Sequence, residues 1–506
     1  MSPNGTDNRI RDVVIVGGGT AGWMTAAALA DHFRGSRMTI TLVESSSIGT
    51  IGVGEATIPT IRQFYQSIGL RDLDVMKATH GTVKLGIQFD GWLNPESSFI
   101  HPFGVYGQDL RNIPFHQYWL RLRAAGEQTD FGDYSLAVAL ARAGRFTTPS
   151  PNPPSTLSVF DWALHFDAGL FAQFLRKNAE GKGVRRIDAK VERVEQRAED
   201  GHITGLLLDN GDTITGDLFV DCSGFGGLLI EGAMKSGYED WTQWLFCDRA
   251  LAAQGNAISP PPPYTRVTAH SAGWRWTIPL QHRTGHGYVY SSRFISDGDA
   301  EEELLGAVGR DLKMAPRRIA FTPGRRKQAW KGNCVAIGLS SGFLEPLEST
   351  SIALIETGIE KLKQLFPGRQ IDPRLVDEYN DWSRRELQRV RDFVILHYWA
   401  NQRQDNAFWR ACREVELPES LLHKLEMWKR RGHIIRYRWE MFQPSSWLAI
   451  YNGFGILPDG YDPALDGYDV AGLSRALGGM RNAIAQAVKD CPTHSEFIER
   501  YAKADM

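Results

Sequence analysis

The chain has 506 residues, 42% of them hydrophobic and 23% charged, with a formal net charge of −2. Such a chain is expected to hold more than one core, or one large domain with an insertion. Its near-neutral charge gives no reason to expect nucleic acid or an anionic membrane as a partner. No segment has the roughly 18 to 20 apolar residues of a membrane span, and residues 1–12 lack the apolar stretch of a secretory signal. Five widely spaced cysteines without a CxxC pair indicate structural thiols, no metal site and a cytoplasmic protein.

A nucleotide-binding pattern opens the chain. Residues 13–16 predict a short buried strand, an alanine-rich helix is expected from residue 23 to about residue 33, and a second strand over 38–43 ends at Glu44. Between the first strand and the helix stand the glycines of a dinucleotide fingerprint and the residues they enclose, Gly17, Gly19, Thr20, Ala21 and Gly22. Such glycines let the backbone approach a pyrophosphate and aim a helix N-terminus at it, and Glu44 would bind a ribose hydroxyl.

The nucleotide unit is then interrupted. Polar, glycine-rich sequence from residue 45 to residue 60 predicts a long loop, and alternating apolar residues over 83–90 predict one half-buried strand with Lys84 on its polar face. Four prolines within 147–155 indicate a surface loop, and Asp209-Asn210-Gly211-Asp212 is typical of a hairpin turn.

The strands that complete the nucleotide unit come much later. Buried runs end at Asp221 and at Gly338, and both residues are expected at the flavin edge. This discontinuous assembly favours FAD over NAD, and a single fingerprint argues against a separate NAD(P)H domain, so that reduced flavin has to come from elsewhere. We therefore predict an α/β fold with a Rossmann-like FAD-binding domain of the GR2 or monooxygenase type. It would span residues 1–370 with β-rich insertions near 80–215 and 240–330, followed by a mainly helical substrate-binding or capping region over 371–506.

Trp274-Arg275-Trp276-Thr277-Ile278-Pro279 places two indoles two residues apart and ends on proline. This spacing puts both rings on one face of an extended segment. Two such rings can serve as ordinary sheet packing. Beside a flavin fingerprint they also predict a rigid wall between the flavin and a substrate.

These motifs together resemble the flavin-dependent halogenases of the tryptophan halogenase type, over nearly the whole chain. The resemblance rests on the following blocks: Gly17 to Gly22, Gly52-Val53-Gly54-Glu55-Ala56-Thr57-Ile58-Pro59, the Lys84 strand, Asp221-Cys222-Ser223-Gly224, Trp274 to Pro279, and Pro346-Leu347-Glu348-Ser349-Thr350. It implies that FADH2 from a separate flavin reductase reacts with O2 to a C4a-hydroperoxide, that chloride or bromide attacks it, and that hypohalous acid travels an internal tunnel to a lysine beside an electron-rich aromatic ring.

The resemblance also implies roles for single residues. Lys84 would be the catalytic lysine and Glu348 the essential glutamate, which orients the electrophile or accepts the ring proton. The amides near Thr350 and Ser351, at the start of a helix predicted to reach about residue 366, would bind the halide, although Ser349 to Ser351 also suit simple helix capping. Ala56 and Ile58 would lie along the flavin, while Trp274, Trp276 and Pro279 would separate it from the substrate.

The substrate side is indicated by two segments. His101-Pro102-Phe103 resembles the His-x-Phe that lies beside the indole in the free-tryptophan members, and the C-terminal counterpart includes Trp447. That segment, residues 442–451, lacks the paired tyrosines expected to grip an amino acid, so a neutral indole or a related aromatic is favoured over free tryptophan. A homodimer is compatible with the sequence. The alternative function is a flavin monooxygenase that hydroxylates an aromatic ring, which would need no halide.

Overall fold

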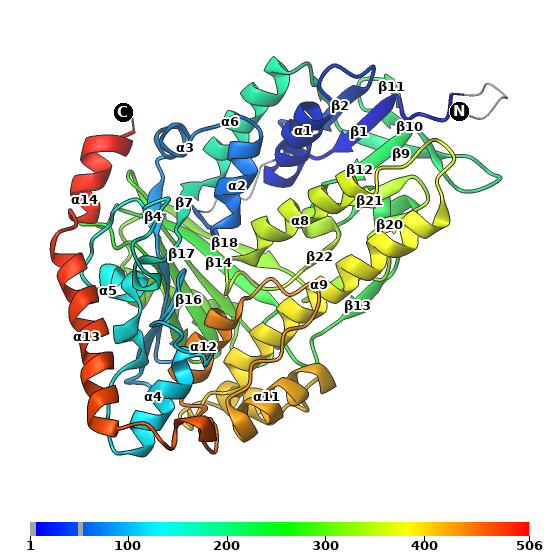
Figure 1. Ribbon diagram of the computed structural model, residues 1–506. Coiled ribbons are helices and arrows are strands. Elements are labelled where there is room, and N and C mark those ends of the chain that lie inside the picture. The colour runs from blue at the N-terminus through cyan, green and yellow to red at the C-terminus, as the bar shows by residue number, and fades with distance from the viewer. Residues whose placement is uncertain (1–6, 49–53, 505–506) are drawn as a thin grey trace.

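A six-stranded sheet, parallel except at one edge, collects segments from distant parts of the chain (Figure 1). The computed structural model describes residues 7–48 and 54–504, so Gly52 and Val53 of the expected flavin loop lie outside the described part. The strand order is β20-β21-β12-β1-β2-β8. Their bounds are β1 (Asp12–Val16), β2 (Thr39–Glu44), β8 (Arg185–Asp188), β12 (Leu218–Asp221), β20 (Trp330–Lys331) and β21 (Cys334–Ala336).

The late completion of this sheet is confirmed. β1 pairs in parallel with β2 and β12, and β12 pairs in parallel with β21. The continuous apolar run of β1 suits a central parallel strand that is covered on both faces. β8, which lies within the range expected as an insertion, pairs with β2 and so belongs to this sheet.

Helix α1 (Thr20–His32) lies on this sheet and packs against α6 (Ala168–Gly181) and α8 (Thr350–Gln364). The alanines of α1 bring its backbone close to its neighbours, since their side chains are small. The helices predicted to begin near residues 23 and 351 are thus observed, each with slightly earlier bounds. The hairpin predicted at Asp209–Asp212 joins β10 (Ile203–Leu208) to β11 (Thr213–Thr215).

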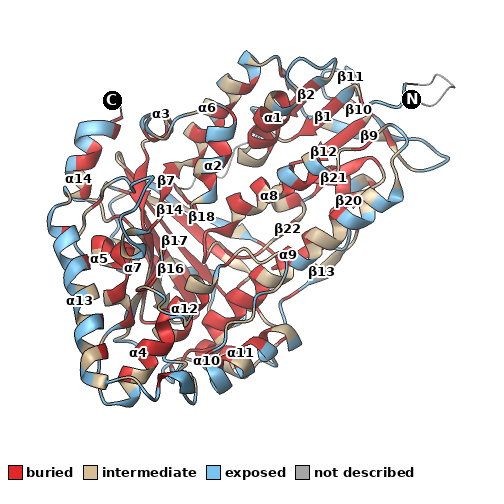
Figure 2. Ribbon diagram, viewed as in Figure 1, coloured by how far each residue is buried: buried red, intermediate tan, exposed pale blue. Residues whose placement is uncertain are grey.

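A second, seven-stranded sheet occupies the other half of the molecule, in the order β18-β14-β17-β16-β15-β5-β6. Strands β14, β16 and β17 are largely buried, as their red colour in Figure 2 shows. The bounds are β5 (Gly86–Asp90), β6 (Ser98–Pro102), β14 (Arg249–Gly255), β15 (Thr265–His270), β16 (Gly273–Pro279), β17 (Thr284–Tyr290) and β18 (Leu312–Ala320).

The strand expected over residues 83–90 is in fact two strands, so that prediction is wrong in one respect. β4 (Thr82–Lys84) pairs with β7 (Ala163–Asp167), which also pairs with β3 (Gly54–Ala56), whereas β5 belongs to the seven-stranded sheet. The chain changes sheets at Leu85, whose backbone bonds instead to Pro263 and Phe103. Lys84 consequently lies where two sheets meet, fully buried, and not on a half-exposed face.

The C-terminal region is helical, as predicted. Figure 1 shows α9 running diagonally beneath α8, while α13 and α14 line the opposite side of the molecule. The bounds are α9 (Pro373–Trp399), α10 (Ala407–Arg413), α11 (Glu419–Arg431), α12 (Pro444–Gly453), α13 (Val470–Lys489) and α14 (His494–Phe497). The other helices are α2 (Thr60–Ser67), α3 (Asp72–Ala78), α4 (Phe115–Ala124), α5 (Leu136–Arg142) and α7 (Asp297–Val308).

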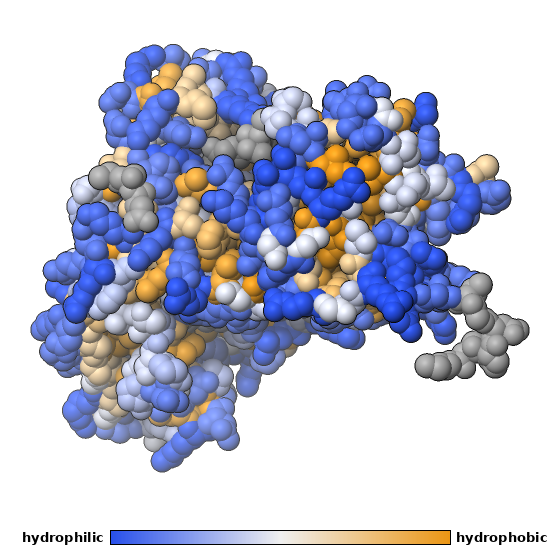
Figure 3. Space-filling view, turned by 90° about the horizontal axis from the view of Figure 1, so that it is seen from above, coloured by the Kyte–Doolittle hydropathy of each residue, from blue (hydrophilic) through white to orange (hydrophobic). Residues whose placement is uncertain are grey.

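The remaining strands are β9 (Val191–Gln196), β13 (Tyr238–Asp240), β19 (Gly324–Arg326) and β22 (Gly342–Phe343). Seen from above, apolar residues gather in a patch framed by polar ones (Figure 3). Within residues 7–48 and 54–504, no helix is long and apolar enough to cross a membrane.

Candidate active site

The glycine fingerprint forms a cradle between β1 and α1. Gly17 has a φ of +114°, and a Cβ atom there would lie 2.2 Å from the carbonyl oxygen of Cys222. A Cβ at Gly18 would collide with the carboxylate of Glu44, whose Oε1 accepts a 2.5 Å bond from Arg186. The bare backbone, the helix N-terminus and the carboxylate fit the pyrophosphate and ribose of a dinucleotide.

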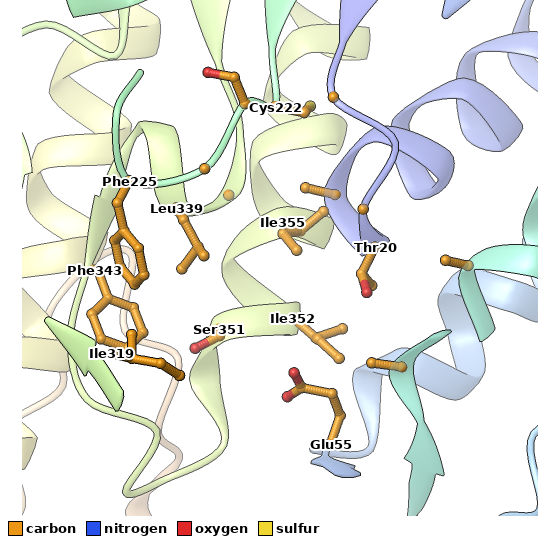
Figure 4. A pocket seen from close by; sticks show the side chains of 18 of the residues that line it. Thr20, Glu55, Cys222, Phe225, Ile319, Leu339, Phe343, Ser351, Ile352 and Ile355 are labelled. Carbon is orange, nitrogen blue, oxygen red and sulfur yellow. The ribbon is translucent and has the colours of Figure 1, made fainter. Parts of the chain in front are cut away.

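The cradle opens into a cavity of about 810 Å³. Its walls include most of the expected cofactor and wall residues and one expected halide residue, namely Gly17, Gly19, Thr20, Ala21, Glu44, Ala56, Gly338, Trp274 and Trp276, and Ser351. Figure 4 shows the aromatic side, with Phe225 and Phe343 close together, and Glu55 pointing in from the opposite side. Burial and the nearby Asp167 raise the pKa of Glu55 to about 7. A mostly apolar cavity of this size can take a tricyclic ring.

The two indoles form a wall of this cavity, at its boundary with the seven-stranded sheet. Their ring centres are 6.1 Å apart, and Trp274 donates from Nε1 to Glu345 over 3.0 Å. Burial raises the pKa of Glu345 to about 7. The ring of Trp276 lies so close to Gly287 that any side chain at residue 287 would overlap it. Pro279 accepts a 2.6 Å bond from Thr82, which ties the wall to the Lys84 strand.

Lys84 sits behind the cavity with its amine fully buried. Its Nζ donates to the carbonyl of Thr57 over 2.9 Å and to Oγ of Ser349 over 2.8 Å, and it lies 5.1 Å from the centre of the Phe103 ring. Burial lowers its pKa to about 7, against the opposing attraction of Glu348. A neutral amine with a free lone pair is thus accessible near physiological pH.

Ser349 connects the lysine to the cavity, because it lines the cavity and bonds to Lys84. It is the N-cap residue of α8, with a left-handed φ of 58°, yet its hydroxyl makes no capping bond. The first amide groups of α8 therefore have no side-chain cap, which leaves them suited to an anion.

Glu348 lies between two histidines. Its Oε2 is 2.9 Å from Nδ1 of His101 on β6, and its Oε1 is 2.7 Å from Nε2 of His397 on α9. All three side chains are at most 2% exposed. Burial opposes ionisation of the carboxyl, but the two imidazoles outweigh this and hold the pKa of Glu348 below its ordinary value.

Aromatic rings surround this cluster on the C-terminal side. Phe393 stacks on Phe442 with ring centres 3.8 Å apart and meets Trp447 edge-on at 4.9 Å. The ring of His101 lies 5.9 Å from that of Phe393. Direct contacts thus link Glu348 to His101, and His101 to Trp447 through Phe393. Lys84 bonds to Ser349, the residue after Glu348, and lies against Phe103.

Four other expected residues take different positions. The carboxylate of Asp221 accepts bonds from Ser223, Leu229 and Ile230, so it shapes the loop after β12 and does not line the cavity. Gly22 and Thr350 likewise lie outside the cavity lining, although each is next in sequence to a lining residue, and Ile58 lies outside it two residues after Ala56.

His397 and Glu345 are absent from the sequence predictions. His397 stands alone in an apolar helical stretch, where a histidine carries no local sign of a role. Glu345 sits three residues before Glu348, and nothing in the sequence shows that it meets Trp274. Both contacts come from long-range packing of α9 and β16 against the loop before α8.

The cradle takes a dinucleotide and the cavity beyond it suits a flavin, so fold and site together define a flavoprotein oxidoreductase. The chain belongs to the tryptophan halogenase family, whose model, described as tryptophan halogenase, matches residues 12–469. It is accordingly a flavin-dependent halogenase, of a family that uses FADH2 and halide and receives reduced flavin from a separate reductase.

Individual relatives match over nearly their whole length. The tryptophan 6-halogenase SttH of Streptomyces toxytricini is 36% identical over 519 residues, covering 96% of this chain and 97% of the relative. The tryptophan 7-halogenase RebH of Lentzea aerocolonigenes is 32% identical, with 97% and 99% covered. The solved structure of BrvH, a flavin-dependent halogenase from Brevundimonas sp. BAL3, has a TM-score of 0.95 at 59% identity, covering 98% of this chain and 100% of that one.

Proposed function

We propose that this halogenase transfers halogen from hypohalous acid, presented by Lys84, to a neutral indole or a related electron-rich ring. Reduced FAD, when bound, supplies the electrons with which O2 and halide become hypohalous acid. The chain's own residues hold the halide, exclude the substrate from the cavity, position the electrophile and remove the ring proton.

The buried amine of Lys84 carries this proposal. Two of its N–H groups are used on Thr57 and Ser349, so a neutral amine keeps its lone pair for hypohalous acid. Ser349 also lines the cavity, which places the lysine one hydrogen bond from the space where the acid forms. The amide groups at the start of α8, by Thr350 and Ser351, are the proposed halide site, because the hydroxyl that would cap them is turned to Lys84.

The indole wall supports halogenation over hydroxylation. Trp274 and Trp276 occupy the cavity wall, and Trp274 packs on Trp92, which in turn lies against His397 beside Glu348. This run of rings extends from the cavity wall to the Glu348 cluster. An aromatic substrate beside Lys84 would therefore be kept from the flavin, while a small acid could pass by Ser349.

The aromatic surface around Trp447 favours a neutral substrate. The cation of Lys424 lies 4.2 Å from the centre of the Trp447 ring, but it forms a 2.7 Å ion pair with Glu440. These two charges satisfy each other and leave neither for an amino acid's carboxylate or ammonium group. Phe393, Phe442 and Trp447 then offer flat apolar surface, which suits indole better than free tryptophan.

Mass spectrometry of indole and tryptophan incubated with the enzyme, FAD, a flavin reductase, NADH and bromide or chloride tests this proposal. We expect halogenated indole in excess of halogenated tryptophan, and neither with Lys84→Ala, although that variant still consumes NADH and O2. A halide-independent gain of 16 Da would instead identify a hydroxylase, and a preference for tryptophan would refute the substrate proposal alone.

A further inference from the structure

The hydrogen bonds around Glu348 fix how many protons its cluster holds. Nδ1 of His397 lies 2.7 Å from the carbonyl oxygen of Phe393, which can only accept, so Nδ1 carries a proton. The other nitrogen of the same ring, Nε2, faces Glu348 Oε1 over 2.7 Å. Were His397 neutral and Glu348 ionised, a nitrogen lone pair would face a carboxylate oxygen. The contact therefore contains one further proton, shared between the two groups.

The second histidine is arranged differently. His101 donates from Nδ1 to Glu348 Oε2, while its Nε2 is buried and has no hydrogen-bond partner. A neutral imidazole that donates from Nδ1 has a lone pair on Nε2. His101 thus presents an unused proton acceptor in the aromatic surroundings of Phe393 and Phe442.

The two sides of Glu348 are therefore not equivalent. The carboxylate already shares a proton with His397 on one oxygen, and it supports an imidazole with an open nitrogen on the other. A carboxylate behind an imidazole stabilises the imidazolium that forms when the ring accepts a proton. The open nitrogen, and not the carboxylate, is the available base.

We propose that Nε2 of His101 accepts the ring proton of the halogenated intermediate, with Glu348 stabilising the imidazolium and His397 neutralising Glu348 from behind. This assignment rests on the halogenase function proposed above. Addition of halogen to the ring leaves one carbon with both halogen and hydrogen. The proton of that carbon passes to Nε2, and the electron pair of the broken C–H bond restores the aromatic ring. His101 later releases the proton to water. His101 is then a catalytic residue and His397 a positioning residue.

The protonation pattern can be measured without turnover. In the full-length enzyme labelled with ¹⁵N-histidine, NMR at pH 7.5 should show His101 with a protonated Nδ1 and a bare Nε2, and His397 with protons on both nitrogens or shared at Nε2. His101→Gln and His397→Gln assign the two signals by their loss. Protonation of His101 at Nε2, or a bare Nε2 on His397 beside an ionised Glu348, would overturn the assignment.

A deuterium isotope effect tests the proton transfer itself. Turnover is measured separately with saturating indole and with ring-deuterated indole. In the wild type, where earlier steps limit the rate, we expect the turnover ratio of normal to deuterated indole to be about 1. In His101→Gln we expect this ratio to be about 2 or more, with turnover of normal indole lowered about 100-fold or more. A ratio that stays near 1 in His101→Gln but rises in Glu348→Gln would make the carboxylate the base.

The positioning role of His397 is tested by the pH profile. His397→Gln can still donate to Glu348 but brings no charge, so the uncompensated carboxylate makes His101 more basic. The acid limb of the pH profile of turnover should therefore move to higher pH. A purely structural loss would lower the rate at every pH without shifting this limb. The titratable group in contact with His101 is Glu348, which also contacts His397 and is attracted by Lys84. The control is His423→Gln, an exposed histidine on α11.

The experiments separate the two proposals. If the wild type halogenates indole but His101→Gln shows no isotope effect, the base assignment fails and the halogenase function stands. If the wild type leaves indole unchanged, the substrate proposal fails, and the nitrogen measurement still decides which histidine nitrogen is open.

Discussion

Replacing Lys84 by methionine should abolish halogenation and yet stabilise the protein. Methionine has nearly the volume of lysine without the amine, and the amine is expensive to bury. The pKa of Lys84 lies at about 7 compared with 10.5 for a free lysine. At about 1.4 kcal/mol for each tenfold change in a protonation equilibrium, burial of the amine costs roughly 4 kcal/mol at pH 7.

Part of this cost is recovered by the bonds of the amine. The hydrogen bonds to Thr57 and Ser349 contribute about 1 kcal/mol each, so the variant should be more stable by about 2 kcal/mol. The sign also follows from linkage. The unfolded chain binds the lysine proton up to about pH 10.5 and the folded chain only up to about pH 7. The free energy of unfolding of the wild type is therefore lowered below pH 10.5, and by the full amount below pH 7.

The assay is thermal unfolding of the wild type and Lys84→Met at pH 7 and pH 9, together with product formation from indole. We expect a higher Tm for the variant, a smaller difference at pH 9, no halogenated product, and continued NADH consumption with the reductase. A variant that melts lower than the wild type at pH 7 would refute the reasoning, because the bonds of the amine would then outweigh its desolvation.

Three further predictions concern the fold around the site. Gly17→Ala should abolish FAD binding in a flavin-fluorescence titration, because its Cβ would meet a backbone carbonyl at 2.2 Å with φ at +114°, whereas Gly181→Ala, which has open space around it, should bind normally. His494 accepts a bond from the backbone of the Lys84 strand and burial lowers its pKa to about 4, so between pH 6.5 and 4 the unfolded chain binds a proton that the folded chain does not. The free energy of unfolding should therefore fall by roughly 3 kcal/mol as the pH drops through that window. The Tm of His494→Gln should fall less than that of the wild type over the same range, and equal falls in Tm would contradict this role. Trp274→Phe leaves the buried Glu345 without one donor and should lower stability by about 1–3 kcal/mol in denaturant unfolding, with an unchanged midpoint counting against that role.

The nucleotide half of the fold is predictable because its signals are local. A stretch of about thirty residues contains the first strand, the glycines from Gly17 to Gly22 and Glu44 after them. The late strands at Asp221 and Gly338 are also recognisable as short buried runs that each end at a turn. Both join the sheet of β1, because β12 pairs with β1 and β21 pairs with β12, although their order in the sheet is not a local property.

The burial of Lys84 could not be predicted in this way. Alternation places it on the polar face of a strand, and only the change of sheets at Leu85 and the approach of Ser349 enclose it. The contact of His397 is even less predictable from the sequence, because its partner Glu348 is 49 residues away in the chain. The predicted cytoplasmic location and homodimer stay predictions.

In the proposed mechanism, Ser349 makes halide preference and regioselectivity inseparable. One residue, in a left-handed conformation, sets both the entrance to the first turn of α8 and the place of the lysine amine. An engineer who alters residue 349 to change which halide is accepted would also shift the atom that delivers the halogen, and with it the position of attack on the ring. Halide preference and regioselectivity would then have to be optimised together, with compensating changes on β4, and not one after the other.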